Sequence, residues 1–92
     1  MSLPDGNRLL ILDLLVRFGE LTGADMLEHE PSLPRGTIYT TLLRLDKQKL
    51  VTSRRERSKR QSGPPRRYYT ITALGQRVHQ AAMAGQAVLA AV

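Results

Sequence analysis

Apolar residues follow one another almost without interruption in the segment NRLLILDLLVRF, which runs from Asn7 to Phe18. Drawn as a helix, this segment is apolar nearly all round, and we expect Asn7 to be its N-cap and Gly19 to end it. A helix that is apolar on every side is buried on every side, and a chain of 92 residues rarely covers both faces. We therefore expect one face to pack on the chain's own core and the other on a second copy.

The pattern then predicts two further helices joined by a turn. Thr22–His29 is expected to form a short helix, because Thr22 and Asp25 have the spacing of a capping box. Two prolines in the segment EPSLPRG indicate a turn. The third helix is expected over Pro34–Lys49, with Ser32 as its candidate cap. Two helices joined in this way are typical of a helix-turn-helix.

The third predicted helix has two distinct faces. Its apolar side chains Ile38, Leu42 and Leu45 share one face. Tyr39 and Leu43 lie on the flank. Tyr39 has two open interpretations, packing on the following hairpin or donating its hydroxyl group to a phosphate. The face opposite the apolar stripe is polar and basic, and it carries Thr37, Thr40, Arg44 and Lys47.

Two short segments rich in Val, Thr, Ile and Tyr follow, and they predict a hairpin. They cover residues 50–55 and 66–71, and a Gly-Pro-Pro turn at residues 63–65 lies between them. Alternation along the strands points Val51, Tyr69 and Ile71 inward. The predicted fold is therefore mainly α with a two-stranded β-wing, that is, a winged helix-turn-helix.

The last segment, Thr72–Val92, is predicted to be a helix capped by Thr72. A stripe of apolar and small side chains follows it: Leu74, Val78, Ala81, Ala82, Gly85 and Leu89. The helix could lie back on its own domain, or it could pair with a second copy. We expect the second arrangement, with residues 1–71 as the DNA-binding domain and residues 72–92 as a C-terminal dimerisation helix.

Charge is unevenly distributed along the chain, which has a net charge of +6. Residues 1–34 hold two basic and six acidic side chains, whereas residues 35–71 hold eleven basic and two acidic ones. A basic run is often only a solvated loop, but a basic half beside an acidic half makes a face that attracts polyanions. Placed on a wing behind a helix-turn-helix, this charge favours binding to double-stranded DNA.

Other classes of function find little support in the sequence. The chain has no cysteine, and its two histidines, His29 and His79, are fifty positions apart, so we expect no metal site. No nucleophile motif, paired carboxylates or phosphate-binding loop is present, so we expect neither an enzyme nor a cofactor. No apolar run approaches the ~20 residues of a membrane span. We expect a cytoplasmic protein that does not enter membranes.

Two motifs resemble the PadR family of transcriptional regulators. Gly36-Thr37-Ile38-Tyr39 resembles the start of that family's recognition helix, and Leu42, Leu45, Leu50 and Val51 continue the likeness into the wing. The wing ends in a Tyr-Tyr-x-x-Thr-x-x-Gly pattern formed by Tyr68, Tyr69, Thr72 and Gly75. The chain departs from the family where Thr40 replaces a common proline, where Lys49 replaces a common glycine, and where Gly23-Ala24 replaces a common Gly-Tyr pair.

Together these features predict a sequence-specific DNA-binding transcriptional repressor that acts as a homodimer on a pseudo-palindromic operator. The resemblance also implies a small hydrophobic effector at the dimer interface. The alternative is a winged-helix module that binds protein or RNA. The expected DNA-binding residues are Arg35, Thr37, Tyr39, Thr40, Arg44, Lys47, Arg54, Arg55, Arg57, Lys59, Arg60, Arg66 and Arg67. The expected dimer interface comprises Leu10, Leu14, Phe18, Leu74, Val78, Ala82, Gly85 and Leu89.

Overall fold

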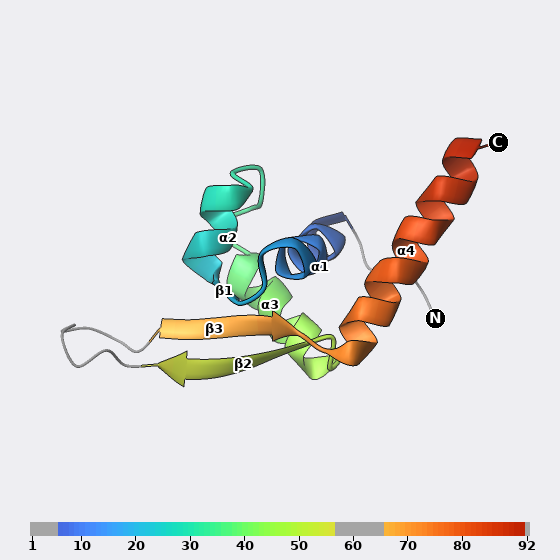
Figure 1. Ribbon diagram of the computed structural model, residues 1–92. Coiled ribbons are helices and arrows are strands. Elements are labelled where there is room, and N and C mark those ends of the chain that lie inside the picture. Colours follow the sequence, from blue (N-terminus) through green and yellow to red (C-terminus); the bar gives the residue numbers. More distant parts are fainter. Residues whose placement is uncertain (1–5, 57–65, 92) are drawn as a thin grey trace.

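The chain folds as three packed helices, a β-hairpin and a fourth helix that leaves the hairpin at its base (Figure 1). The computed structural model describes residues 6–56 and 66–91, with side chains described as far as residue 85. The elements are α1 (Gly6–Phe18), β1 (Leu21–Thr22), α2 (Gly23–His29), α3 (Ile38–Lys47), β2 (Val51–Glu56), β3 (Arg66–Ile71) and α4 (Ala73–Ala91).

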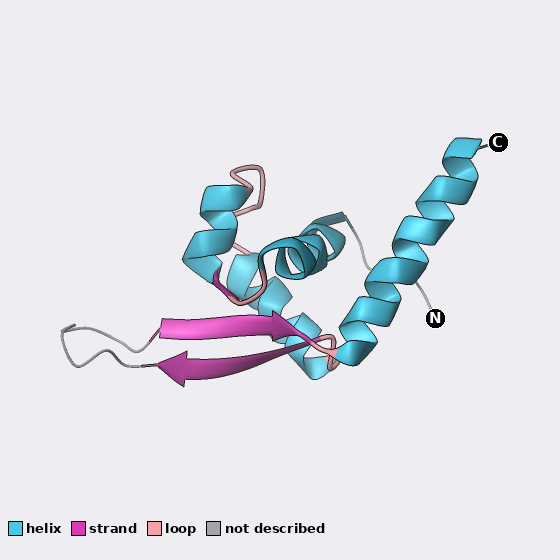
Figure 2. Cartoon of the chain, viewed as in Figure 1, coloured by secondary structure: helices cyan, strands magenta, loops and turns pink. Residues whose placement is uncertain are grey.

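The wing belongs to a three-stranded antiparallel sheet in the order β1-β3-β2 (Figure 2). Val51 pairs with Ile71 at the base of the hairpin, and Leu21 of β1 pairs with Tyr69. The predicted hairpin and the fold class are confirmed. The strand β1 was not predicted, because two residues are too few to show any alternation. The predicted Gly-Pro-Pro turn lies outside the described residues.

The core is built on the inner face of α3 and on most of α1. Ile38, Leu42 and Leu45 are at most 1% exposed, as the sequence predicts. Leu14 of α1 is also buried, and α4 packs against α1 with Val78 and Ala82 buried. His79 of α4 bonds Asp13 of α1 through Nε2 and Oδ1 at 3.0 Å. Much of the α1 face that was assigned to a second copy is therefore covered by the chain's own α4.

The helix ends differ in how well local sequence predicts them. The capping box of α2 is confirmed, with Thr22 Oγ1 accepting from the Asp25 amide at 3.1 Å and Asp25 accepting from the Thr22 amide at 3.0 Å. The cap proposed at Ser32 is wrong. Ser32 donates to Glu30, and α3 begins only at Ile38, because the intervening residues form turns. Asn7 is likewise inside α1 rather than capping it, since α1 begins at Gly6.

The joint between the wing and α4 explains the Thr-x-x-Gly part of the motif. Thr72 caps α4, since its Oγ1 accepts from the Gly75 amide at 3.0 Å and donates to the Lys49 carbonyl at 2.6 Å. The Leu50 carbonyl accepts from the Thr72 amide at 3.0 Å. A Cβ on Gly75 would come within 2.1 Å of that same Leu50 oxygen. A side chain at position 75 would therefore separate α4 from the base of the wing.

Lys49 links α3 to β2 in the left-handed region, with φ of 62°. A non-glycine residue there costs about 1–2 kcal/mol, while glycine loses about 0.5–1 kcal/mol more conformational entropy on folding. We predict that Lys49→Gly raises the free energy of unfolding by up to about 1 kcal/mol in urea titration. Lys47→Gly, at the last residue of α3, should lower it by up to about 1 kcal/mol. A loss of stability in Lys49→Gly would contradict this account.

Candidate nucleic-acid interface

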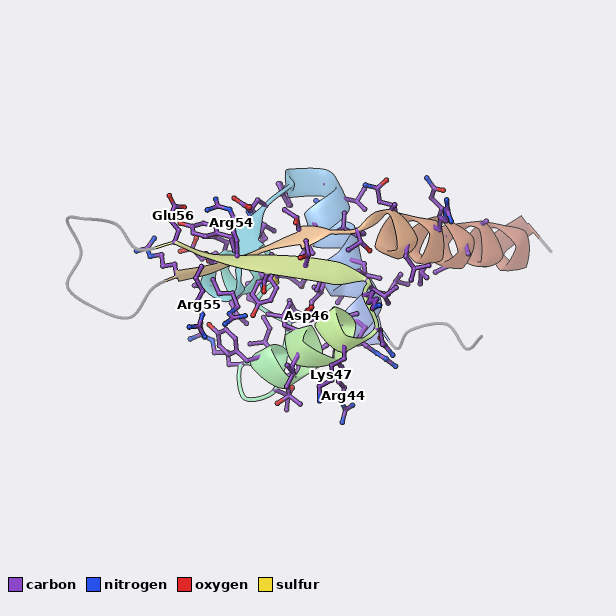
Figure 3. The ribbon with its side chains drawn as sticks, turned by 90° about the horizontal axis from the view of Figure 1, so that it is seen from below. Arg44, Asp46, Lys47, Arg54, Arg55 and Glu56 are labelled. Atoms are coloured by element: carbon purple, nitrogen blue, oxygen red, sulfur yellow. The ribbon has the colours of Figure 1, made fainter. Side chains whose placement is uncertain are left out.

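The outer face of α3 is polar, basic and solvent-exposed. Because the core stripe holds the inner face, the opposite side chains point away from the protein, and Figure 3 shows Arg44 and Lys47 in this position. Neither side chain has an ion-pair partner among residues 6–56 and 66–91. The exposed residues of this face include those predicted from the sequence, Thr37, Thr40, Arg44 and Lys47.

Tyr39 lies between α2 and the wing. Its ring is so close to Gly23 that a Cβ added there would lie 2.8 Å from the ring. Tyr39 also lines an open cleft of about 560 Å³ together with Arg66 and Arg67 of β3. Its side chain is 60% exposed. The ring therefore packs on α2 rather than being buried under the hairpin. The phenol stands in a cleft that is lined by two arginines of β3 and by Asp25 and Glu28 of α2.

Strand alternation divides the basic side chains of the wing between two faces. Arg55 pairs with Arg67, on the face shared with the inward residues Val51 and Tyr69. Figure 3 shows Arg55 on the α3 side of β2, whereas Arg54 and Glu56 lie on the other side. Arg67 donates to Ser53 at 3.2 Å. Thus Arg55 and Arg67 face the same side as the exposed surface of α3.

Arg54 is engaged within the chain. Its guanidinium donates from Nη2 and Nε to the two oxygens of Glu20, at 2.5 and 2.8 Å, and from Nη1 to Glu56 at 3.0 Å. It also lies 4.8 Å above the ring centroid of Tyr68. These hydrogen bonds lower the pKa of the Glu20 carboxyl group and raise the pKa of Arg54 further above its ordinary value. Two carboxylates therefore offset the charge of Arg54, a residue that the sequence predicts to bind DNA.

Sequence reasoning missed Glu20, and no local signal could have found it. Glu20 and Arg54 are 34 positions apart, and the ion pair forms only because β1 and β2 flank the same strand. Of the other predicted DNA-binding residues, Arg35 and Arg66 are exposed. Arg57, Lys59 and Arg60 lie outside the described residues.

The residues predicted for a dimer interface do not form one exposed surface. Leu14, Val78 and Ala82 are buried within the chain at 8% exposure or less. Phe18 stacks on His29, with ring centroids 4.0 Å apart, and Arg17 lies over the Phe18 ring. Leu74 is exposed, Leu10 and Gly85 are half-buried, and the Leu89 side chain lies outside the described part of α4.

The fold and this surface define a winged helix-turn-helix protein. Residues 11–81 match the "Transcriptional regulator PadR-like family", and the chain belongs to that family. The class is one of DNA-binding transcriptional regulators rather than enzymes, as the sequence predicts. In the described part of the chain, none of the helices is long and apolar enough to cross a membrane. Residues 6–56 and 66–91 hold no cluster of metal-ligating side chains.

Solved structures show the same fold. A PadR family transcription regulator from Clostridium difficile is 21% identical, with a TM-score of 0.77 over 92% of this chain and 91% of that one. One from Eggerthella lenta is 26% identical, with a TM-score of 0.74 over 90% and 73%. Bacillus subtilis PadR, in complex with operator DNA, is 27% identical, with a TM-score of 0.68 over 79% and 44%. No curated protein sequence matches the chain.

The two faces of the wing should differ in their effect on DNA affinity. We predict that Arg55→Gln makes the negative slope of log K against log salt shallower by about 0.9, the value for one lost phosphate contact. The control is Glu20→Gln with Arg54→Gln, which removes one charge of each sign and should leave the slope nearly unchanged. The measurement is fluorescence anisotropy titration of one duplex at several salt concentrations. Equal slopes for wild type and Arg55→Gln would mean that Arg55 does not contact phosphate.

Proposed function

We propose that this protein is a sequence-specific DNA-binding repressor that acts in the cytoplasm as a homodimer on a pseudo-palindromic operator. The observation that carries the proposal is the common orientation of the outer face of α3 and of Arg55 and Arg67 on the wing. A helix can enter the major groove while the wing contacts the flanking backbone. Membership of the PadR-like family supports the same function.

Base reading is assigned to α3. Thr37, the residue just before α3, and Thr40, in its first turn, carry hydroxyl and methyl groups that can contact base edges. Arg44, one turn further along, can donate two hydrogen bonds to a guanine, and no ion pair within the described chain occupies it. Lys47 lies near the end of the helix and supplies a charge for phosphate.

Backbone contacts are assigned to the wing and to the turn before α3. Tyr39, Arg66 and Arg67 line the cleft at the start of β3, and Arg55 lies opposite Arg67 on β2. Arg35 extends the positive charge along the turn. By sequence the wing loop adds Arg57, Lys59 and Arg60. Such contacts add affinity for any duplex and position the helix, but they do not select a sequence.

Dimerisation is assigned to the α1–α4 side of the molecule. The outer half of α4 extends away from all other elements (Figure 1), and residues 72–92 are proposed as the dimerisation helix. A groove beside it is lined by Leu9 and Leu10 of α1 and by Met83 of α4. This groove could receive a second copy, because its apolar side chains are not fully covered within the chain. The same groove is where we expect a small hydrophobic effector to bind between two copies.

The function itself is tested by selecting sites from random duplexes and comparing the selected duplex with random duplex, single strands and RNA. A repressor of the proposed kind binds the selected duplex most tightly. Its two inverted half-sites should have centres roughly 34 Å apart, one helical turn. Failure to enrich any duplex, or preference for RNA, would overturn the proposal.

For Arg44→Ala we predict a loss of about 1–3 kcal/mol on the selected operator, roughly 5- to 150-fold in Kd, because a bidentate base contact is removed. Binding to random duplex should change only a few-fold. Lys47→Ala is the control, and it should weaken both duplexes alike. If Arg44→Ala also weakens both alike, Arg44 contacts phosphate, and base reading rests on the threonines.

For dimerisation we predict that Met83→Glu converts the protein from dimer to monomer in sedimentation velocity while it stays folded, because Met83 is 37% exposed. Gln80→Glu adds the same charge to an exposed position of α4 and should leave the dimer intact. Leu14→Glu would not test the interface, because Leu14 belongs to the core and its replacement would unfold the chain. A wild-type protein that sediments as a stable monomer at micromolar concentration would contradict the proposed interface.

A further inference from the structure

The exposed surface of α3 includes one large aliphatic side chain. Leu43 is 55% exposed, although the neighbouring exposed positions on that surface, Thr40, Arg44 and Lys47, are polar or charged. Single exposed leucines are common and usually need no explanation. The position of Leu43 is what distinguishes it, because it lies on the helix to which base reading is assigned.

Helix geometry places Leu43 well within the outward face. At about 100° per residue, Leu43 lies about 45° from the direction opposite the core stripe. Arg44 lies at a similar angle on the other side, with Thr40 and Lys47 between them. Tyr39, one turn before Leu43, lies in the cleft beside the wing, so Leu43 is on the wing side of the helix.

The DNA major groove offers one apolar group to such a side chain, the 5-methyl group of thymine. We propose that Leu43 is a specificity-determining residue that packs on the methyl group of a thymine in each half-site, on the wing side of the base contacted by Arg44. This inference rests on the proposed function, because it requires α3 to lie in the major groove. The proposed contact predicts a preference for thymine at one operator position, which hydrogen bonds alone would not produce.

The core does not account for Leu43. The inner face of α3 is already filled by Ile38, Leu42 and Leu45, so the truncation Leu43→Ala should leave the fold intact. A protein partner at this position would have to cover Arg44 and Lys47 as well, and burying unpaired charges is unfavourable. Double-stranded DNA accepts both the charges and the aliphatic group on one surface, which is why we assign it as the occupant.

The test replaces each thymine of the selected operator by deoxyuridine, one at a time, which removes the methyl group and keeps base pairing. Wild-type protein should lose about fourfold in affinity at one thymine per half-site, the equivalent of ~0.8 kcal/mol for one buried methyl group. With Leu43→Ala the same replacement should change affinity by less than about 1.5-fold. Val16→Ala, which shortens an exposed apolar side chain of α1, is the control and should keep the wild-type response.

The outcomes separate this inference from the proposed function. Specific binding with the same uracil response in wild type and Leu43→Ala would overturn the inference and leave the function standing. Equal weakening of operator and random duplex by Leu43→Ala would also overturn it. If no duplex is selected at all, the proposed function fails, and the assignment of Leu43 fails with it.

Discussion

The burial of three side chains on the inner face of α3 is the constraint on which the rest of the interface depends. Ile38, Leu42 and Leu45 are held in the core, so α3 cannot rotate about its axis without exposing them to water. The opposite face is thereby presented to solvent in one fixed orientation. Burying each of these side chains contributes about 1.5–3 kcal/mol to stability. The same burial also orients the recognition surface.

A second constraint is the close approach of the base of the wing to α4. The Leu50 carbonyl accepts from the Thr72 amide and lies against Gly75, while the Thr72 hydroxyl group bonds the Lys49 carbonyl. These contacts connect the end of α3, the wing and the proposed dimerisation helix within a few residues.

Charge in this protein is organised by geometry rather than by composition. Arg54 and Arg55 are neighbours in sequence, but strand alternation turns one toward Glu20 and the other toward the side of α3. Glu20, an acidic residue of the first half, thus offsets charge on the wing through its ion pair with Arg54. A simple count of basic residues overstates the charge that is available to DNA at Arg54.

Helix periodicity and strand alternation in the sequence were enough to predict the helix-turn-helix, the wing and the outward face of α3, because these patterns reflect local geometry. The capping box at Thr22 is local for the same reason. Only the tertiary structure decided that α4 covers much of α1, that Glu20 pairs with Arg54, and that β1 joins the sheet. Each of these depends on segments distant in sequence, whose meeting no local pattern encodes. Periodicity shows that α1 is apolar nearly all round, but it does not indicate which segment covers each face, and the structure buries Leu14 within the chain.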